Sequence, residues 1–165
     1  MRSLIFCCAL ALAPLAAGCA RHYIPNTDVE ETDLNRKVIE FCEEYRNAVE
    51  LRNVALLLKF ADPKYYEDGG SVDTSDDLDY AGLKEFLEDK FKKSKAIRYE
   101  IRYRNVSAGR KNSILVDYTY TASYKVPTGA AGEGGVAGDV WRREVADNRL
   151  ELVRKGESFR ILGGM

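Results

Sequence analysis

The sequence changes its hydrophobic period once, and this change constrains the fold more than any other feature. Between residues 33 and 91, apolar side chains recur every three or four residues, as they do on one face of an α-helix. From residue 97 onward they alternate with polar residues, which is typical of strands with one buried face. Helices that all precede the strands predict an α+β domain with an antiparallel sheet packed against the helices.

The helical part divides into three predicted helices. The first begins at Asp33 and carries a single apolar stripe. A shorter helix follows Asn53, whose side chain can cap it, and ends before Pro63, because proline disfavours helical geometry in the preceding residue. The third helix covers residues 80–91. The break between the first two is short, so we expect them to form a helical hairpin.

The alternating part divides into four predicted strands, at residues 97–106, 113–126, 139–153 and 158–162. Turn residues at 109–112 join the first two strands, and residues 155–157 join the last two. In the third strand the apolar residues change phase between Ala146 and Arg149, which favours a β-bulge there.

Residues 1–18 have the features of a secretory signal peptide. Arg2 precedes an apolar run at residues 4–12, Pro14 ends the run, and small residues follow it. The run is too short to span a bilayer as a mature helix. We therefore expect this segment to direct export and to be removed.

The end of this segment, Leu15-Ala-Ala-Gly-Cys19, resembles the bacterial lipobox, although its leucine lies one position farther upstream than usual. The resemblance implies that Cys19 is acylated and becomes the mature N-terminus. Several acyl chains, at roughly 0.8 kcal/mol per buried CH₂, exceed the requirement for stable anchoring. The polar residues 19–32 are then expected to form a tether. The alternative is an ordinary signal peptide followed by an incidental cysteine.

Lipidation would place the domain in the cell envelope, on a membrane that it does not cross. Ala20 follows the cysteine where an aspartate would indicate retention at the inner membrane. The resemblance therefore implies an outer-membrane protein that faces the periplasm.

The composition excludes several classes of function. The 25 lysines and arginines nearly balance 26 aspartates and glutamates, so no basic surface for nucleic acid is expected. Once the signal is removed and Cys19 is acylated, Cys42 is the remaining cysteine, and His22 is the single histidine. These counts leave no disulfide framework, no Cys/His metal site and no histidine-dependent hydrolase. We expect no cofactor and no metal, and a buried, inert Cys42.

The order of the elements resembles the SnoaL-like superfamily, also called nuclear transport factor two-like. The resemblance is carried by residues 41–53, by Ala61-Asp-Pro63, by Tyr65-Tyr-Glu-Asp68 and by the last two strands. It implies that residues 33–165 form a cone-shaped α+β barrel, in which a curved antiparallel sheet wraps around three N-terminal helices and encloses a pocket. It also implies frequent homodimers. Members include enzymes, carriers and interaction modules, so the fold alone does not select a function.

Ketosteroid isomerase shares this fold, and three of its residue types recur here. In that enzyme a carboxylate base moves a proton, while a tyrosine and a protonated aspartic acid bind the enolate oxygen. The corresponding positions are Tyr45, Asp68 and Asp147. The chemistry requires a dry pocket, because desolvation is what keeps an aspartic acid protonated. The same residues also suit structural roles, since Tyr45 continues the apolar stripe and Asp68 lies in an acidic, turn-rich segment.

Aromatic residues on the strands form a second candidate site, consisting of Tyr99, Tyr103, Tyr118, Tyr120 and Trp141. They could line a pocket for a small apolar ligand, or they could pack in the core or at a dimer contact. We expect a membrane-anchored envelope lipoprotein whose domain binds a small apolar ligand or an envelope protein without chemistry. The alternative is an acid/base enzyme of the ketosteroid isomerase type.

Overall fold

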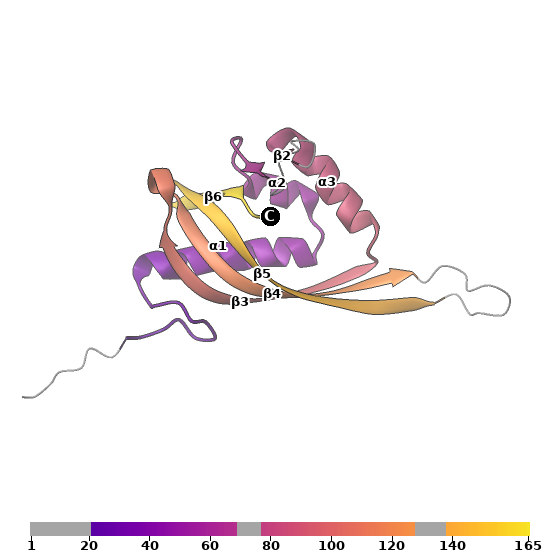
Figure 1. Cartoon of the computed structure of the whole chain (residues 1–165), viewed down its shortest axis with the longest axis horizontal. Coiled ribbons are helices and arrows are strands. Elements are labelled where there is room, and N and C mark those ends of the chain that lie inside the picture. Colours follow the sequence, from indigo (N-terminus) through magenta and orange to yellow (C-terminus); the bar gives the residue numbers. More distant parts are fainter. Residues whose placement is uncertain (1–20, 69–76, 128–137) are drawn as a thin grey trace, which may run out of the picture.

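The computed structural model of the chain describes residues 21–68, 77–127 and 138–165 (Figure 1). The predicted signal peptide at residues 1–18 and the lipidation site Cys19 lie outside these ranges. Within them, no helix has both the length and the apolar character that a transmembrane span requires.

Three helices form where the sequence predicts them: α1 (Asp33–Glu50), α2 (Val54–Phe60) and α3 (Tyr80–Lys92). Each begins at a side-chain cap. The side chains of Thr32, Asn53 and Asp79 accept hydrogen bonds from the backbone N–H groups three residues further on. Such caps satisfy amides that helix geometry leaves unpaired, so these boundaries are encoded locally.

Four antiparallel strands follow in the order in which they occur in the chain: β3 (Ala96–Ala108), β4 (Ile114–Pro127), β5 (Asp139–Lys155) and β6 (Ser158–Gly163). The sheet curves around α1, and α2 and α3 lie above the open end of this curve (Figure 1). The predicted α+β class and the curved sheet are confirmed. The sheet does not close into a barrel, however, because β3 and β6 remain as its two edges.

The strand register corrects one prediction. β4 and β5 pair without a shift from Ile114–Leu152 to Pro127–Asp139, so the bulge predicted between Ala146 and Arg149 is absent. Register shifts occur instead in β3, between Tyr103 and Asn105, and in β5 where it pairs with β6. The change of apolar phase in β5 therefore has another cause, which is that its first half exposes apolar residues on the outer face of the sheet.

A second, two-stranded sheet joins the ends of the acidic segment. It pairs β1 (Tyr66–Glu67) with β2 (Leu78–Asp79), directly before α3. Neither strand is predicted from the sequence, because two residues are too few to establish a period.

The core lies between the helices and the concave face of the large sheet. Its residues with no measurable exposure come from all three helices and three strands: Val38, Cys42, Ala48, Leu57, Leu83, Val116, Leu150, Leu152 and Ile161. The predicted burial of Cys42 is confirmed. Burial raises the pKa of its thiol, which leaves the sulfur in its unreactive protonated form.

Residues 21–32 are folded, although the sequence predicts a tether there. Val29 is 2% exposed and belongs to the core. The N–H of Asp28 donates to the carbonyl of Tyr103, and the Asp28 carboxylate pairs with Arg102 and Arg104 at 2.7 and 3.0 Å. This segment therefore covers part of the free edge of β3, and the domain begins before α1.

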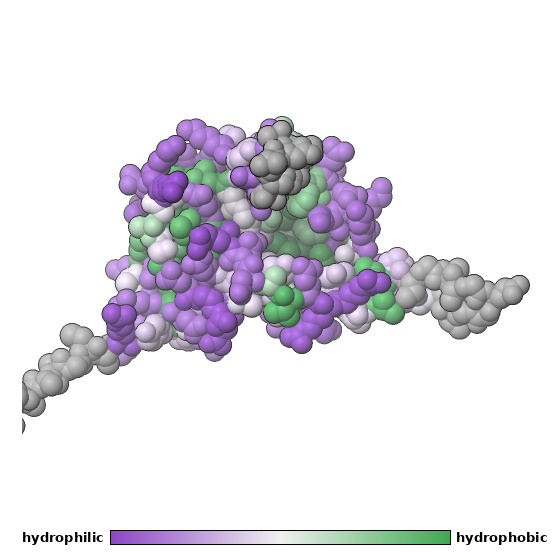
Figure 2. Space-filling view, in the orientation of Figure 1, coloured by the Kyte–Doolittle hydropathy of each residue, from purple (hydrophilic) through white to green (hydrophobic). Residues whose placement is uncertain are grey.

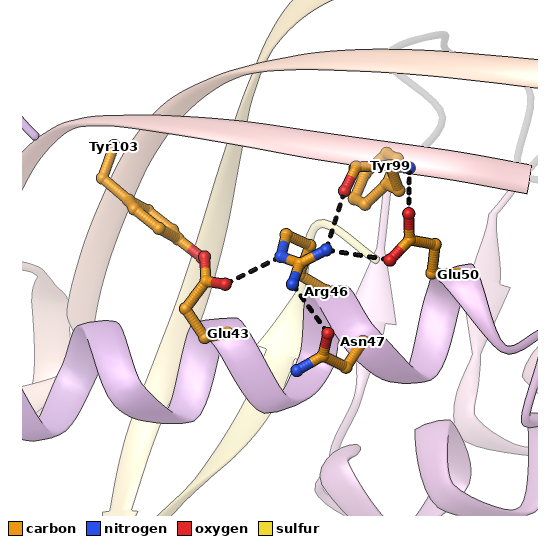
Figure 3. A network of polar contacts seen from close by, with 6 residues as sticks. All are labelled: Glu43, Arg46, Asn47, Glu50, Tyr99 and Tyr103. Carbon is orange, nitrogen blue, oxygen red and sulfur yellow. Dashed lines mark hydrogen bonds and ion pairs between the residues drawn. The ribbon is translucent and has the colours of Figure 1, made fainter. Parts of the chain in front are cut away.

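Side chains of α1 bind the same edge at Tyr99 (Figure 3). The Arg46 guanidinium donates to Glu43 at 2.7 Å, to Glu50 at 3.0 Å and to the backbone carbonyl of Tyr99 at 3.1 Å. Glu50 in turn accepts from the N–H of Tyr99, and Glu43 accepts from the Tyr103 hydroxyl. The unpaired backbone groups at Tyr99 thus find partners on the helix, and α1 is fixed across the sheet.

Candidate functional site

A cavity of about 430 Å³ lies between α3 and the concave face of the sheet. Figure 2 shows hydrophobic residues gathered in a recess there, with hydrophilic residues around it. The apolar and aromatic lining comes from α1, α3, β3, β4 and the end of the sequence: Tyr45, Val49, Phe86, Leu87, Phe91, Ile97, Tyr99, Tyr120, Ala122, Tyr124, Val126 and Met165.

A cluster of neutral polar groups lies at the buried side of this cavity. Tyr45, on α1, is 4% exposed, and its side chain lies next to those of Tyr99 and Tyr118. The side-chain amide of Asn148 also donates to the Tyr118 hydroxyl, at 3.1 Å. Burial raises the pKa of both tyrosines, so they stay protonated and neutral at physiological pH. We call Tyr45, Tyr99, Tyr118 and Asn148 the polar cluster.

Charged residues of the lining are the more exposed ones. The Tyr120 hydroxyl donates to the carboxylate of Glu144 at 2.7 Å. Burial and this carboxylate raise the pKa of Tyr120 to about 12. On α3 the ammonium of Lys90 lies 5.2 Å from the centre of the Phe86 ring, and Lys93 pairs with Asp89. The cavity therefore combines charged groups near solvent with neutral hydroxyls at its buried side.

The structure places only one of the three isomerase-like residues in this cavity. Tyr45 lines it, as the resemblance implies. Asp147 does not, because it lies on the outer face of β5, where its carboxylate accepts from the Thr119 hydroxyl at 2.6 Å. There it belongs to a separate depression, bordered by charged residues that include Arg104 and Arg149. Asp68 follows β1, is exposed and is not part of the cavity lining.

Asn148, and not Asp147, is the residue of this part of β5 that lines the cavity. Alternate residues of a strand face opposite sides of a sheet, and Asn148 shares its side with the buried Leu150 and Leu152. Counting back two residues from Leu150, to the next side chain on the same face, identifies Asn148. The phase of Trp141 and Val145, which points to Asp147, belongs to the outer face, and both residues are about half exposed.

The aromatic residues of the second candidate site divide in the same way. Tyr99 and Tyr120 line the cavity, with ring centres 5.5 Å apart, and Tyr118 is buried beside them in the polar cluster. Tyr103 is buried under α1, where it binds Glu43, and does not reach the cavity. Trp141 lies on the outer face with its ring 5.0 Å from the Arg98 guanidinium. Tyr103 and Trp141 therefore do not belong to the expected pocket.

Three kinds of lining residue are not predicted from the sequence. Phe86 and Lys90 lie on a helix whose packing partner is not visible in the sequence. Glu144 faces the concave side of the sheet like Asn148, but its charge does not mark it as an inward-facing residue. Met165 lies outside every predicted helix and strand. A correct phase for β5 would have identified Glu144, whereas no signal in the sequence points to Met165.

Among the described residues, no three His, Cys, Asp or Glu side chains are grouped so that they could hold a metal ion.

The sequence matches no protein-family model and no curated protein. Solved structures match over most of the chain. The Kfla4162 protein of Kribbella flavida has a TM-score of 0.58 and 18% identity, covering 79% of this chain and 86% of its own. ActVI-ORFA of Streptomyces coelicolor has a TM-score of 0.58 and 14% identity, covering 79% and 94%.

A putative scytalone dehydratase of Novosphingobium aromaticivorans has a TM-score of 0.54 and 9% identity, covering 79% of this chain and 80% of its own. At identities this low, the structural match establishes a shared fold, and no activity can be transferred from one protein to another. The chain therefore shares its α+β fold, with helices packed against a curved antiparallel sheet, with these proteins.

Proposed function

We propose that this domain binds a small, largely apolar molecule that carries one neutral polar group, and that it does so without chemistry. The observation that carries the proposal is the pairing of an apolar cavity with the polar cluster at its buried side. Its volume of about 430 Å³ falls within the range of roughly 300–1,000 Å³ that is common for small-molecule sites.

The chemistry of the lining narrows the ligand class. The aromatic rings of Tyr99 and Tyr120 line the cavity and favour contact with a flat or aromatic portion of the ligand. The protonated hydroxyls of the polar cluster favour a carbonyl or hydroxyl group over a charged one, because burying an unpaired charge is costly. An aromatic or alicyclic alcohol or ketone fits both requirements.

We also propose that the domain is held in the cell envelope by acylation of Cys19. The support is the lipobox-like segment before this residue and the export signal that precedes it. Because residues from Arg21 onward are described as part of the folded domain, an anchored domain would lie close to the membrane surface. Intact mass measurement of the protein from its host, compared with a Cys19→Ser variant, tests this directly.

The binding proposal is tested by filling the cavity. Ala122 lines it, whereas Ser123 is the next residue of β4 and its side chain projects to the outer face. We expect Ala122→Trp to abolish binding of a neutral hydrophobic fluorescent probe, N-phenyl-1-naphthylamine, and the matched Ser123→Trp to leave it unchanged. Equal binding by the wild-type protein and both folded variants would refute the proposed site.

An acid/base enzyme is the second candidate, and the pair formed by Tyr120 and Glu144 favours it. A carboxylate at 2.7 Å from a tyrosine hydroxyl within a ligand cavity provides a base next to an acid. We would test enolisation of small ketones by following exchange of their α-protons in deuterated buffer. Loss of exchange in Glu144→Gln, with retention in the exposed Glu100→Gln, would support catalysis. No exchange above background in the wild-type protein would exclude it for these substrates.

A further inference from the structure

The end of the sequence lies inside the cone, between the helices and the sheet (Figure 1). The carbonyl of Gly164 accepts a hydrogen bond from the Asn148 amide at 3.3 Å. The backbone N–H of Met165 donates to the hydroxyl of Tyr65, also at 3.3 Å, and this tyrosine is 2% exposed. Tyr65 is itself fixed, because its hydroxyl donates to Glu67 at 2.6 Å. Two hydrogen bonds thus hold the segment that presents Met165 to the cavity.

Two glycines make this position possible. Gly164 has a φ of +88°, and a Cβ built on it would lie 1.9 Å from the carbonyl oxygen of Arg149. A Cβ on Gly163 would lie 2.9 Å from the carbonyl oxygen of Tyr66. Backbone atoms block both positions, so no side chain fits without moving the segment. Residues 163–165 therefore occupy a narrow passage between β5 and β1.

We infer that Met165 sets the size of the ligand that the cavity admits, an inference that rests on the proposed binding function. Its side chain lines the cavity, while the passage and the two hydrogen bonds fix its backbone. An unbranched thioether is suited to closing an apolar space of irregular shape. The same amide nitrogen of Asn148 donates to the Gly164 carbonyl and to the Tyr118 hydroxyl, so the residue before Met165 is bound directly to the polar cluster.

A series of 4-alkylphenols measures the ligand length that the cavity admits, since each member has one hydroxyl for the polar cluster and an apolar chain of known length. Titration calorimetry would give the dissociation constant for chains of two to ten carbons. Each methylene that enters the cavity should tighten binding about fourfold. We expect the gain to stop at a chain length set by the cavity. Met165→Ala should move that limit outward by about three carbons, the number of side-chain heavy atoms that it removes beyond Cβ.

A pair of glycine variants provides an independent test. Gly164→Ala should displace the segment through its collision with Arg149, and should move the length limit at least as far as Met165→Ala. Gly156 is the matched control, because it also has a positive φ, of +62°, but has no atom within 4 Å of the added Cβ. Gly156→Ala carries a similar backbone strain and should leave the limit unchanged.

The outcomes separate the two proposals. If the wild-type protein binds the series and neither Met165→Ala nor Gly164→Ala moves the limit from its wild-type value, binding stands and the role of Met165 is overturned. If neither the wild-type protein nor any folded variant binds any member, the proposed binding of aromatic alcohols is itself overturned, and the inference with it. Circular dichroism and urea unfolding of each variant confirm that the compared proteins are folded.

Discussion

Replacing Arg46 by methionine should loosen the attachment of α1 to the free edge of β3. The guanidinium forms ion pairs with Glu43 and Glu50 and hydrogen-bonds the carbonyl of Tyr99 (Figure 3). Methionine keeps most of the apolar stem of arginine, so Arg46→Met removes the charge and the donors while preserving much of the packing.

The size of the effect follows from the exposure of the groups. The side chains of Arg46, Glu43 and Glu50 are 22%, 40% and 35% exposed, so solvent screens both ion pairs. Together the two pairs contribute about 1 kcal/mol. The hydrogen bond from a charged donor to the Tyr99 carbonyl adds about 1 kcal/mol after the same discount. We expect the free energy of unfolding to fall by about 2 kcal/mol.

Urea unfolding at neutral pH and low salt measures this loss. The control is Arg36→Met, which removes one ion pair with Glu31 from an arginine side chain that is 58% exposed, and should cost less than about 0.5 kcal/mol. Part of the difference between the two variants should disappear in 1 M salt, where ionic interactions are screened within about 3 Å. Amide exchange should also quicken at Tyr99, whose N–H binds Glu50. Equal losses in both variants would refute the idea that Arg46 joins helix and strand.

Three further predictions concern the core, a buried carboxylate and the cavity. Leu57→Ala should lower the free energy of unfolding by about 2–5 kcal/mol, whereas Leu51→Ala, at a side chain 73% exposed, should change it by under about 1 kcal/mol in chemical denaturation. Burial by itself raises the pKa of Asp62, but a hydrogen bond from the Lys64 N–H and the ion pair with Lys155 outweigh it and lower the pKa below 3.8. Asp62→Asn should therefore destabilise the domain at pH 7, and thermal melts across pH should show this loss of stability shrinking as the pH falls below 3.8. Asn148→Leu should weaken ligand binding by tenfold or more and Asp147→Asn should not, and calorimetry showing the reverse would restore Asp147 to the site.

The sequence predicts the helices and long strands to within a few residues because their signals are local. Caps such as Asn53 and Asp79 and the stop before Pro63 depend on the residues beside them. The small sheet of β1 and β2 and the docked segment at residues 21–32 are missed. Each depends on a partner elsewhere in the chain, as Asp28 depends on Arg102 and Arg104.

The candidate site is predicted only in part, because alternation along a strand gives two faces without saying which one is concave. Tyr45, Tyr99 and Tyr120 are found because helix and sheet bury the same apolar phases that the sequence displays. Asp147 and Trp141 are misplaced because the first half of β5 carries apolar residues on its outer face.

By itself, the order of periodicities determined that this chain forms helices followed by an antiparallel sheet, since hydrogen bonding and side-chain burial within each element follow from residues that are neighbours in sequence. Tertiary structure alone decided which face of β5 lines the cavity and that residues 163–165 enter it. The physical reason is that curvature and close backbone approach arise between distant segments: Gly164 fits against Arg149 because the sheet and the two-stranded β1–β2 unit come together there.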